Sequence, residues 1–145
     1  MTHRAETILE TVKTLLTGLT TTGIRVERAR VWPVDELPAL SIFKSDDLRS
    51  DEEETLDDQF TRDLTINVQA YVATVDNVET VLNAIAAEVF AAMSADNTLG
   101  LGFVFNALLI GETEPIIERT QDIPIATMTS GWLVSYQHSK TSAES

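Results

Sequence analysis

The sequence predicts an α+β fold, in which two helices pack on a mainly antiparallel sheet of about five strands. Three observations support this prediction. Apolar and polar side chains alternate strictly over residues 62–74, and residues 2–19 and 77–94 each carry one apolar stripe at helical spacing. Short connections join successive strand patterns and favour an antiparallel meander. The expected order of elements is α-β-β-β-α-β-β.

Length and charge limit the classes of protein to which this chain can belong. Its 145 residues suit one domain, expected over residues 1–138, with a flexible tail over residues 139–145. The net charge of −13 repels phosphates and disfavours ordinary nucleic-acid binding. The chain has no cysteine, which excludes disulfides, and no apolar run long enough to cross a bilayer. We therefore expect neither a membrane segment nor a signal peptide.

The first helix is expected over residues 2–19. Thr2 suits its N-cap, and Glu6 suits the positive end of the helix dipole. The β-branched residues 20–22 and Gly23 then end the helix. Its apolar stripe predicts a face that packs on the core, formed by Ala5, Ile8, Val12, Leu15, Leu16 and Leu19.

The first strand is expected over residues 24–32, and it changes its apolar face midway, as at a bulge. Pro33 ends it, because proline cannot donate to a strand ladder. The basic residues of this strand allow two interpretations. They form either a solvated edge that discourages strand addition, or a patch that meets an acidic surface on a neighbouring subunit. The candidate interface residues are Arg25, Arg28, Arg30 and Trp32.

A second strand is expected over residues 37–44, and the most acidic loop of the chain follows over residues 46–58. Runs of like charge repel themselves, so this segment is either a solvated loop or a functional acidic surface. It lacks the glycine and the ligand spacing of a calcium-binding EF-hand loop. The candidate residues are Asp46, Asp47, Asp51, Glu52, Glu53, Glu54, Asp57 and Asp58.

The alternating strand over residues 62–74 is expected at the centre of the sheet. A capping box of Asp76 and Glu79 precedes the second helix, which is expected over residues 77–94. The buried face of the strand is predicted to consist of Leu64, Ile66, Val68, Ala70 and Val72.

Two further strands complete the predicted sheet. Residues 103–112 carry apolar side chains on both faces, so we expect both faces of this strand to be covered. Residues 115–122 are expected to form a connection. The last strand is expected over residues 123–137, with packing residues Met128, Trp132, Val134 and Tyr136.

Motifs of common enzyme classes do not occur in the sequence. It has no Gly-rich phosphate loop, no Gly-x-Ser-x-Gly elbow and no His-Glu-x-x-His zinc motif. His3 and His138 lie near the two ends and are expected to be exposed surface residues rather than metal ligands. We therefore expect no enzyme activity, no catalytic residue, no metal and no cofactor.

Several stretches resemble the tail terminator proteins of phages with long, non-contractile tails, the family of lambda minor tail protein U. The order and spacing of these stretches carry the resemblance, which runs from residue 1 to about residue 137. Leu101 departs from the pattern, which has a second glycine there. The matching stretches are residues 4–9 (RAETIL), 26–33 (VERARVWP), 36–43 (ELPALSIF), 62–72 (RDLTINVQAYV) and 96–100 (DNTLG).

The resemblance implies a structural role in a virion. Proteins of that family form a hexameric ring on the end of the tail tube, stop its polymerisation and offer a joining surface to the head. The implied partners are further copies of the chain, the tail tube protein and a head-completion or connector protein, while genomic DNA passes through without specific binding. The implied location is the head-proximal end of the virion tail, after synthesis in the bacterial host cytoplasm.

The charges of the chain are compatible with such a ring. A closed ring needs one surface to meet a different surface on its neighbour, and the basic strand and the acidic loop offer opposite signs. An acidic lumen would alternatively withhold phosphate contacts from passing DNA. Two other classes stay open. One is another head-tail connector or a tail tube subunit, and the other is a small α+β enzyme or ligand-binding domain with a deep polar pocket. An acidic mimic of DNA, which only the net charge suggests, is a distant third.

Overall fold

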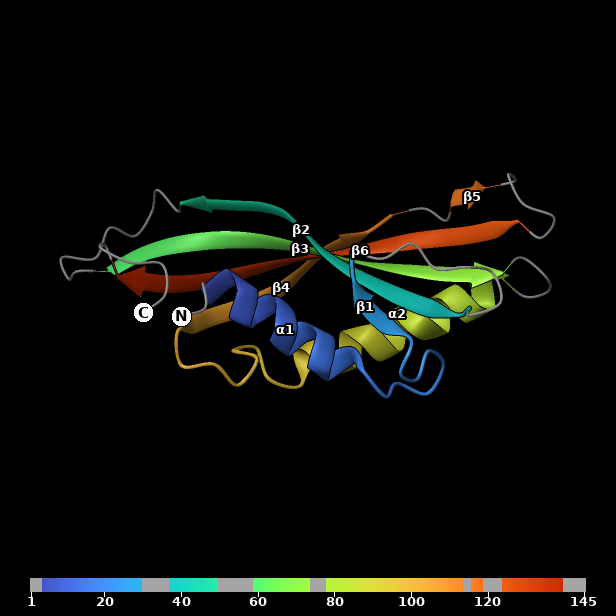
Figure 1. Ribbon diagram of the computed structural model, residues 1–145, viewed down its shortest axis with the longest axis horizontal. Helices are drawn as coiled ribbons and strands as arrows, with labels where there is room; N and C mark the ends of the chain where they lie inside the picture. Colours follow the sequence, from blue (N-terminus) through green and yellow to red (C-terminus); the bar gives the residue numbers. More distant parts are fainter. Residues whose placement is uncertain are drawn as a thin grey trace.

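The computed structural model describes residues 4–29, 37–49, 59–73, 78–113, 116–118 and 124–139. It confirms the α+β fold, with two helices on a mostly antiparallel sheet (Figure 1). The helices are α1 (Arg4–Leu16) and α2 (Val78–Ser94). The strands are β1 (Val26–Arg28), β2 (Ala39–Arg49), β3 (Gln59–Ala73), β4 (Val104–Glu112), β5 (Ile116–Glu118) and β6 (Ile125–Ser139). The three-residue β5 lies inside the segment predicted to be a connection.

The strands follow the order β1-β2-β3-β6-β4, so β3 lies at the centre as predicted. β3 pairs antiparallel with β6 over its whole length, and β4 and β5 follow one another along the other side of β6. The predicted meander is wrong at two places. β6 lies between β3 and β4, and β1 pairs parallel with β2, with Val26 opposite Leu40. The segment that links β1 to β2, residues 29–38, is longer than a hairpin loop, so the chain can return in parallel.

Both helices cover the same face of the sheet, and no described helix covers the opposite face, which we call the open face (Figure 1). The alternation of β3 is confirmed, because Leu64, Ile66 and Val68 are buried under the helices. The four packing residues predicted for β6 are also buried, and Trp132 and Tyr136 are the largest fully buried side chains. On the open face a smaller cluster contains Tyr71, which packs with Ala39 and Ile125.

The second helix matches its prediction closely, whereas the first is shorter than expected. α1 ends at Leu16 rather than residue 19, because Gly18 adopts a positive φ of 95° and the chain turns there. Leu16 is buried, whereas Leu15 is exposed. The proposed N-cap of α2, Asp76, lies outside the described residues, as does Thr2 of the first helix.

The ends of the first two strands differ from the prediction. β1 has only three residues, and Ala29 adopts a positive φ of 52° just after it. β2 continues through Arg49, so Asp46 and Asp47 belong to a strand and not to a loop. The pairing of β2 with β3 resumes after a bulge between Lys44 and Asp46, and this extended pairing holds the acidic residues in the sheet.

β4 forms an edge of the sheet, and the prediction that both its faces are covered is wrong for the described part of the chain. Phe105, Leu108 and Ile110 are 45%, 54% and 60% exposed. The pattern of apolar residues on both faces therefore reports an exposed edge and not a strand buried on both sides. β6 extends through Ser139, one residue into the predicted tail, and residues 140–145 lie outside the described residues.

Within the described residues, no helix combines the length and the hydropathy that crossing a membrane requires.

Candidate assembly surfaces

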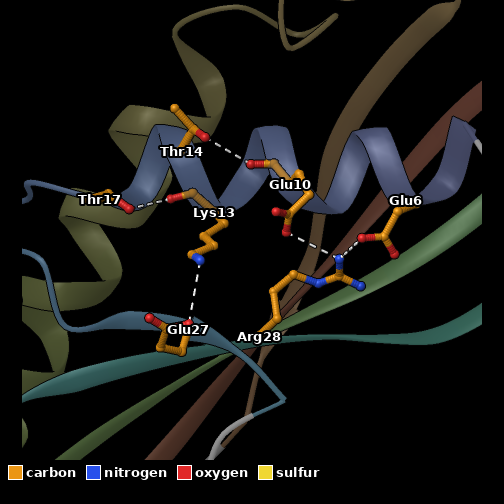
Figure 2. A network of polar contacts seen from close by, with 7 residues as sticks. All are labelled: Glu6, Glu10, Lys13, Thr14, Thr17, Glu27 and Arg28. Atoms are coloured by element: carbon orange, nitrogen blue, oxygen red, sulfur yellow. Dashed lines mark hydrogen bonds and ion pairs between the residues drawn. The ribbon is translucent and has the colours of Figure 1, made fainter. Parts of the chain in front are cut away.

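The basic strand lies beside α1 and forms ion pairs with it (Figure 2). Glu6 and Glu10 are four residues apart, so they project from one face of the helix towards β1. Arg28 donates through Nη1 to both carboxylates, to Glu6 at short range and to Glu10 at 3.2 Å. A second pair joins Lys13 Nζ to Glu27 Oε2 at 3.4 Å. Two consecutive residues of β1, Glu27 and Arg28, thus tie the strand to the helix.

These contacts change the acid–base properties of both partners. The hydrogen bond from Arg28 holds the pKa of the Glu6 carboxyl below its ordinary value, and the same bond raises the pKa of Arg28. The Arg28 side chain is only 28% exposed, so much of its charge is compensated inside the chain. Its Nε is buried and has no hydrogen-bond partner among the described residues. A role of Arg28 between subunits stays a prediction.

Arg25, which directly precedes β1, makes a different contact. Its Nε donates to the carbonyl oxygen of Pro38 at 2.8 Å, and its own carbonyl oxygen accepts from the Leu40 N–H at 2.9 Å. Arg25 therefore fastens the start of β1 to the start of β2. The other two candidate interface residues, Arg30 and Trp32, lie outside the described residues.

The acidic candidates divide into two groups. Asp46 is exposed on β2, whereas the side chain of Asp47 is only 9% exposed. Asp47 accepts hydrogen bonds from the Tyr136 hydroxyl at 2.9 and 3.0 Å, and Arg62 Nη1 lies 3.4 Å from its Oδ2. Burial, together with the Asp47 charge, raises the pKa of Tyr136 well above its usual range. The six remaining acidic candidates, Asp51, Glu52, Glu53, Glu54, Asp57 and Asp58, lie outside the described residues.

A groove of about 390 Å³ crosses the open face of the sheet, and sequence reasoning did not predict it. Gly131 on β6 lies between Asn67 on β3 and Gly111 on β4, and the missing side chains at the two glycines leave space there. A Cβ at Gly131 would lie 3.6 Å from Asn67 Oδ1. The groove is lined by Thr65, Asn67, Ile110, Gly111, Glu112, Thr113, Thr129 and Gly131. Glu112 is the one ionisable side chain among these lining residues.

A second unpredicted feature is an apolar edge along β4 and β5. Bulges between Val104 and Asn106 and between Leu109 and Gly111 interrupt the pairing of β4 with β6. Each bulge contains one apolar residue that is exposed, Phe105 or Ile110. We call the exposed set the β4–β5 edge, formed by Phe105, Leu108, Ile110, Ile116 and Ile117. A signal was present in the sequence, because residues 97–111 contain no charged side chain.

Among the described residues, no group of three His, Cys, Asp or Glu side chains is arranged to hold a metal ion. His138 belongs to β6, where its backbone is opposite Phe60, and His3 lies outside the described residues.

Comparison with known proteins gives a likeness of fold. No protein-family model matches the chain, and no curated protein sequence matches it. Among solved structures, the chain is similar to a chain of the "Virion of native gene transfer agent (GTA) particle". The TM-score is 0.52 at 13% sequence identity, and the match covers 88% of this chain and 84% of that one. The two chains therefore share a fold over nearly their whole lengths.

Proposed function

We propose that the chain is a structural protein of a phage-like virion and, more specifically, a tail terminator. It closes into a ring of copies on the end of the tail tube, stops polymerisation of the tube and provides the surface that joins the head. The observation that carries the proposal is the fold shared with a chain of a gene transfer agent virion, over 88% of this chain. The terminator role rests in addition on the sequence resemblance.

The shape of the sheet supports a ring. Its two edges differ, because β1 forms one edge and β4 with β5 forms the other. A contact between unlike surfaces propagates from copy to copy and closes when the rotation between copies allows it. A sheet with edges of the same kind would instead favour pairing of like edges in a dimer.

The open face of the sheet supports passage of DNA through such a ring. Thr65, Asn67 and Thr129 line its groove and carry no charge. A lumen bordered by these neutral polar side chains and by the acidic Glu112 gives passing phosphates few attractive contacts. The acidic candidates between residues 51 and 58 remain an alternative lining of the lumen. The basic segment with Arg25 and Arg28 remains a candidate contact between neighbouring copies in the ring.

The test is a capping experiment with purified tail tubes and tube protein. Tubes mixed with the chain before fresh tube protein is added should keep their length in electron micrographs, with a ring on one end. Control tubes without the chain should lengthen. If the chain itself assembled into indefinite tubes, it would be a tube subunit. If treated tubes grew as fast as the control and carried no ring, the terminator proposal would be wrong.

A further inference from the structure

Self-association of this chain requires a surface that avoids repulsion between acidic copies. Each copy carries a net charge of −13, so most contacts between two copies bring like charges together. The β4 part of the β4–β5 edge offers such a surface, because residues 97–111 contain no charged side chain. Five large apolar side chains of this edge are each 45–60% exposed, and contact with a partner would remove them from water.

The opposite edge of the sheet offers a matching surface. Ile24 lies just before β1 and is 82% exposed, the largest exposure of any large apolar side chain in the described residues. Arg25 follows it and forms no ion pair within that part of the chain. We call Ile24, Arg25 and β1 the β1 edge. On the β4–β5 edge, the exposed Glu112 follows Ile110 after one residue. Ile24 therefore lies beside Arg25, and Ile110 lies close to Glu112, and these two charges are of opposite sign. The other charged residues of the β1 edge, Glu27 and Arg28, pair with α1.

We infer that the β4–β5 edge of one copy binds the β1 edge of the next copy, with Leu108 and Ile110 contacting Ile24 and with Glu112 facing Arg25. This inference rests on the proposed function and names the contact that builds the ring. The contact uses side chains rather than a continuous strand ladder, because two bulges interrupt β4 and β1 has only three residues.

Thiol cross-linking tests this contact, because the chain has no cysteine of its own. The double variant Ile24→Cys/Leu108→Cys should give a ladder of covalent oligomers with a short bismaleimide. Each single variant should stay monomeric on a denaturing gel. Abundant dimers from Leu108→Cys alone would mean that two β4–β5 edges meet each other and would overturn the inference. Rings of the double variant that assemble but do not cross-link would also overturn the inference.

Assembly strength provides a second readout. Leu108→Thr/Ile110→Thr keeps strand-forming side chains and should weaken association about tenfold or more, because central apolar contacts dominate interfaces. The matched control is Phe90→Gln, which removes a half-exposed apolar side chain from α2 and should leave association within about twofold of wild type. Equal effects of the two variants would contradict the inference. Unchanged melting temperatures would establish that both variants fold.

The outcomes also separate this inference from the proposed function. If wild-type chains cap tubes while the Leu108→Thr/Ile110→Thr variant caps them equally well, the contact is wrong and the terminator role stands. If wild-type chains stay monomeric in salt and on tube ends, both the proposed contact and the terminator role are wrong. If the chain assembles only on the end of a tail tube, the same cross-linking experiment is carried out on capped tubes.

Discussion

Tyr136 on β6 donates its hydroxyl to both carboxylate oxygens of Asp47 on β2, at 2.9 and 3.0 Å, across 89 residues of sequence. The central strand β3 lies between the two strands that carry them. Tyr136 is fully buried, and the Asp47 side chain is almost so. The bond therefore anchors the extended end of β2 to the far side of the sheet.

Tyr136→Phe should lower the free energy of unfolding by about 1–3 kcal/mol, because Asp47 would lose its closest donor while it stays largely buried. Urea denaturation followed by circular dichroism measures this loss. Tyr71→Phe is the matched control, since its hydroxyl bonds the neutral amide of Gln69 at 2.8 Å. It should cost about 0.5–1 kcal/mol. Equal losses would mean that the Asp47 charge does not strengthen the Tyr136 bond.

Arg28→Glu should destabilise the fold modestly, by about 1 kcal/mol, because it places three acidic side chains together at the α1–β1 contact. The charge swap Glu6→Arg/Arg28→Glu should recover most of that loss. The measurement is thermal unfolding of both variants beside wild type.

Ring formation by the same two variants, followed by light scattering, tests the prediction that Arg28 also acts between subunits. If the swap restores stability and not assembly, Arg28 contacts a neighbouring copy. Recovery of both would confine Arg28 to its role within the chain.

The pKa of Glu6 gives a pH dependence with a defined sign. Arg28 holds this pKa in the folded state below its ordinary value of 4.5. The contribution of the pair is therefore complete above about pH 4.5 and is lost as the pH falls through the folded-state pKa. Carboxyl chemical shifts from an NMR titration should place the Glu6 midpoint below 4.5, and Arg28→Gln should raise it. A midpoint that Arg28→Gln leaves unchanged would contradict the pairing.

Two glycine substitutions should have opposite effects. Gly131→Ala should be neutral or stabilising by up to about 1 kcal/mol, because a Cβ there meets its nearest neighbour at 3.6 Å, an ordinary contact. Gly100→Ala should destabilise by about 1 kcal/mol, because Gly100 has a positive φ of 73°. Melting temperatures of the two variants, measured side by side, check the difference in sign.

Salt should promote association of the wild-type chain. Each added copy brings a net charge of −13 next to others, and ions screen that repulsion. Multi-angle light scattering should detect monomers at low ionic strength and larger assemblies in added salt or magnesium. Dissociation by salt would mean that ion pairs rather than apolar contacts hold the copies together.

The fold class and the central elements were predictable because they follow from local periodicity. The alternation of β3 and the stripe of α2 report burial directly, and both were confirmed. The course of β2 was not predictable in the same way. Asp46 and Asp47 indicate a loop when read locally, and only the distant Tyr136 and the pairing with β3 hold them in a strand.

The candidate surfaces were predictable in part. The basic residues of β1 were found, but the internal partners of Arg28 were missed, although Glu6 and Glu10 stand four residues apart on one helix face. β4 was misread as a covered strand, and β5 was missed within a predicted connection. Apolar side chains on both faces have the same pattern in a central and in an edge strand, and only the order of strands in the sheet distinguishes the two.

The position of β6 also determines when the sheet of a newly made chain can be completed. β6 follows every other strand in the sequence, yet it lies between β3 and β4. While the ribosome has not yet released residues 125–139, β4 and β5 have no strand to pair with, and their apolar residues are not aligned along an edge. Completion of the sheet therefore comes after translation of the last strand. If copies associate through the β4–β5 edge as proposed, that edge becomes available only after the last strand has been made.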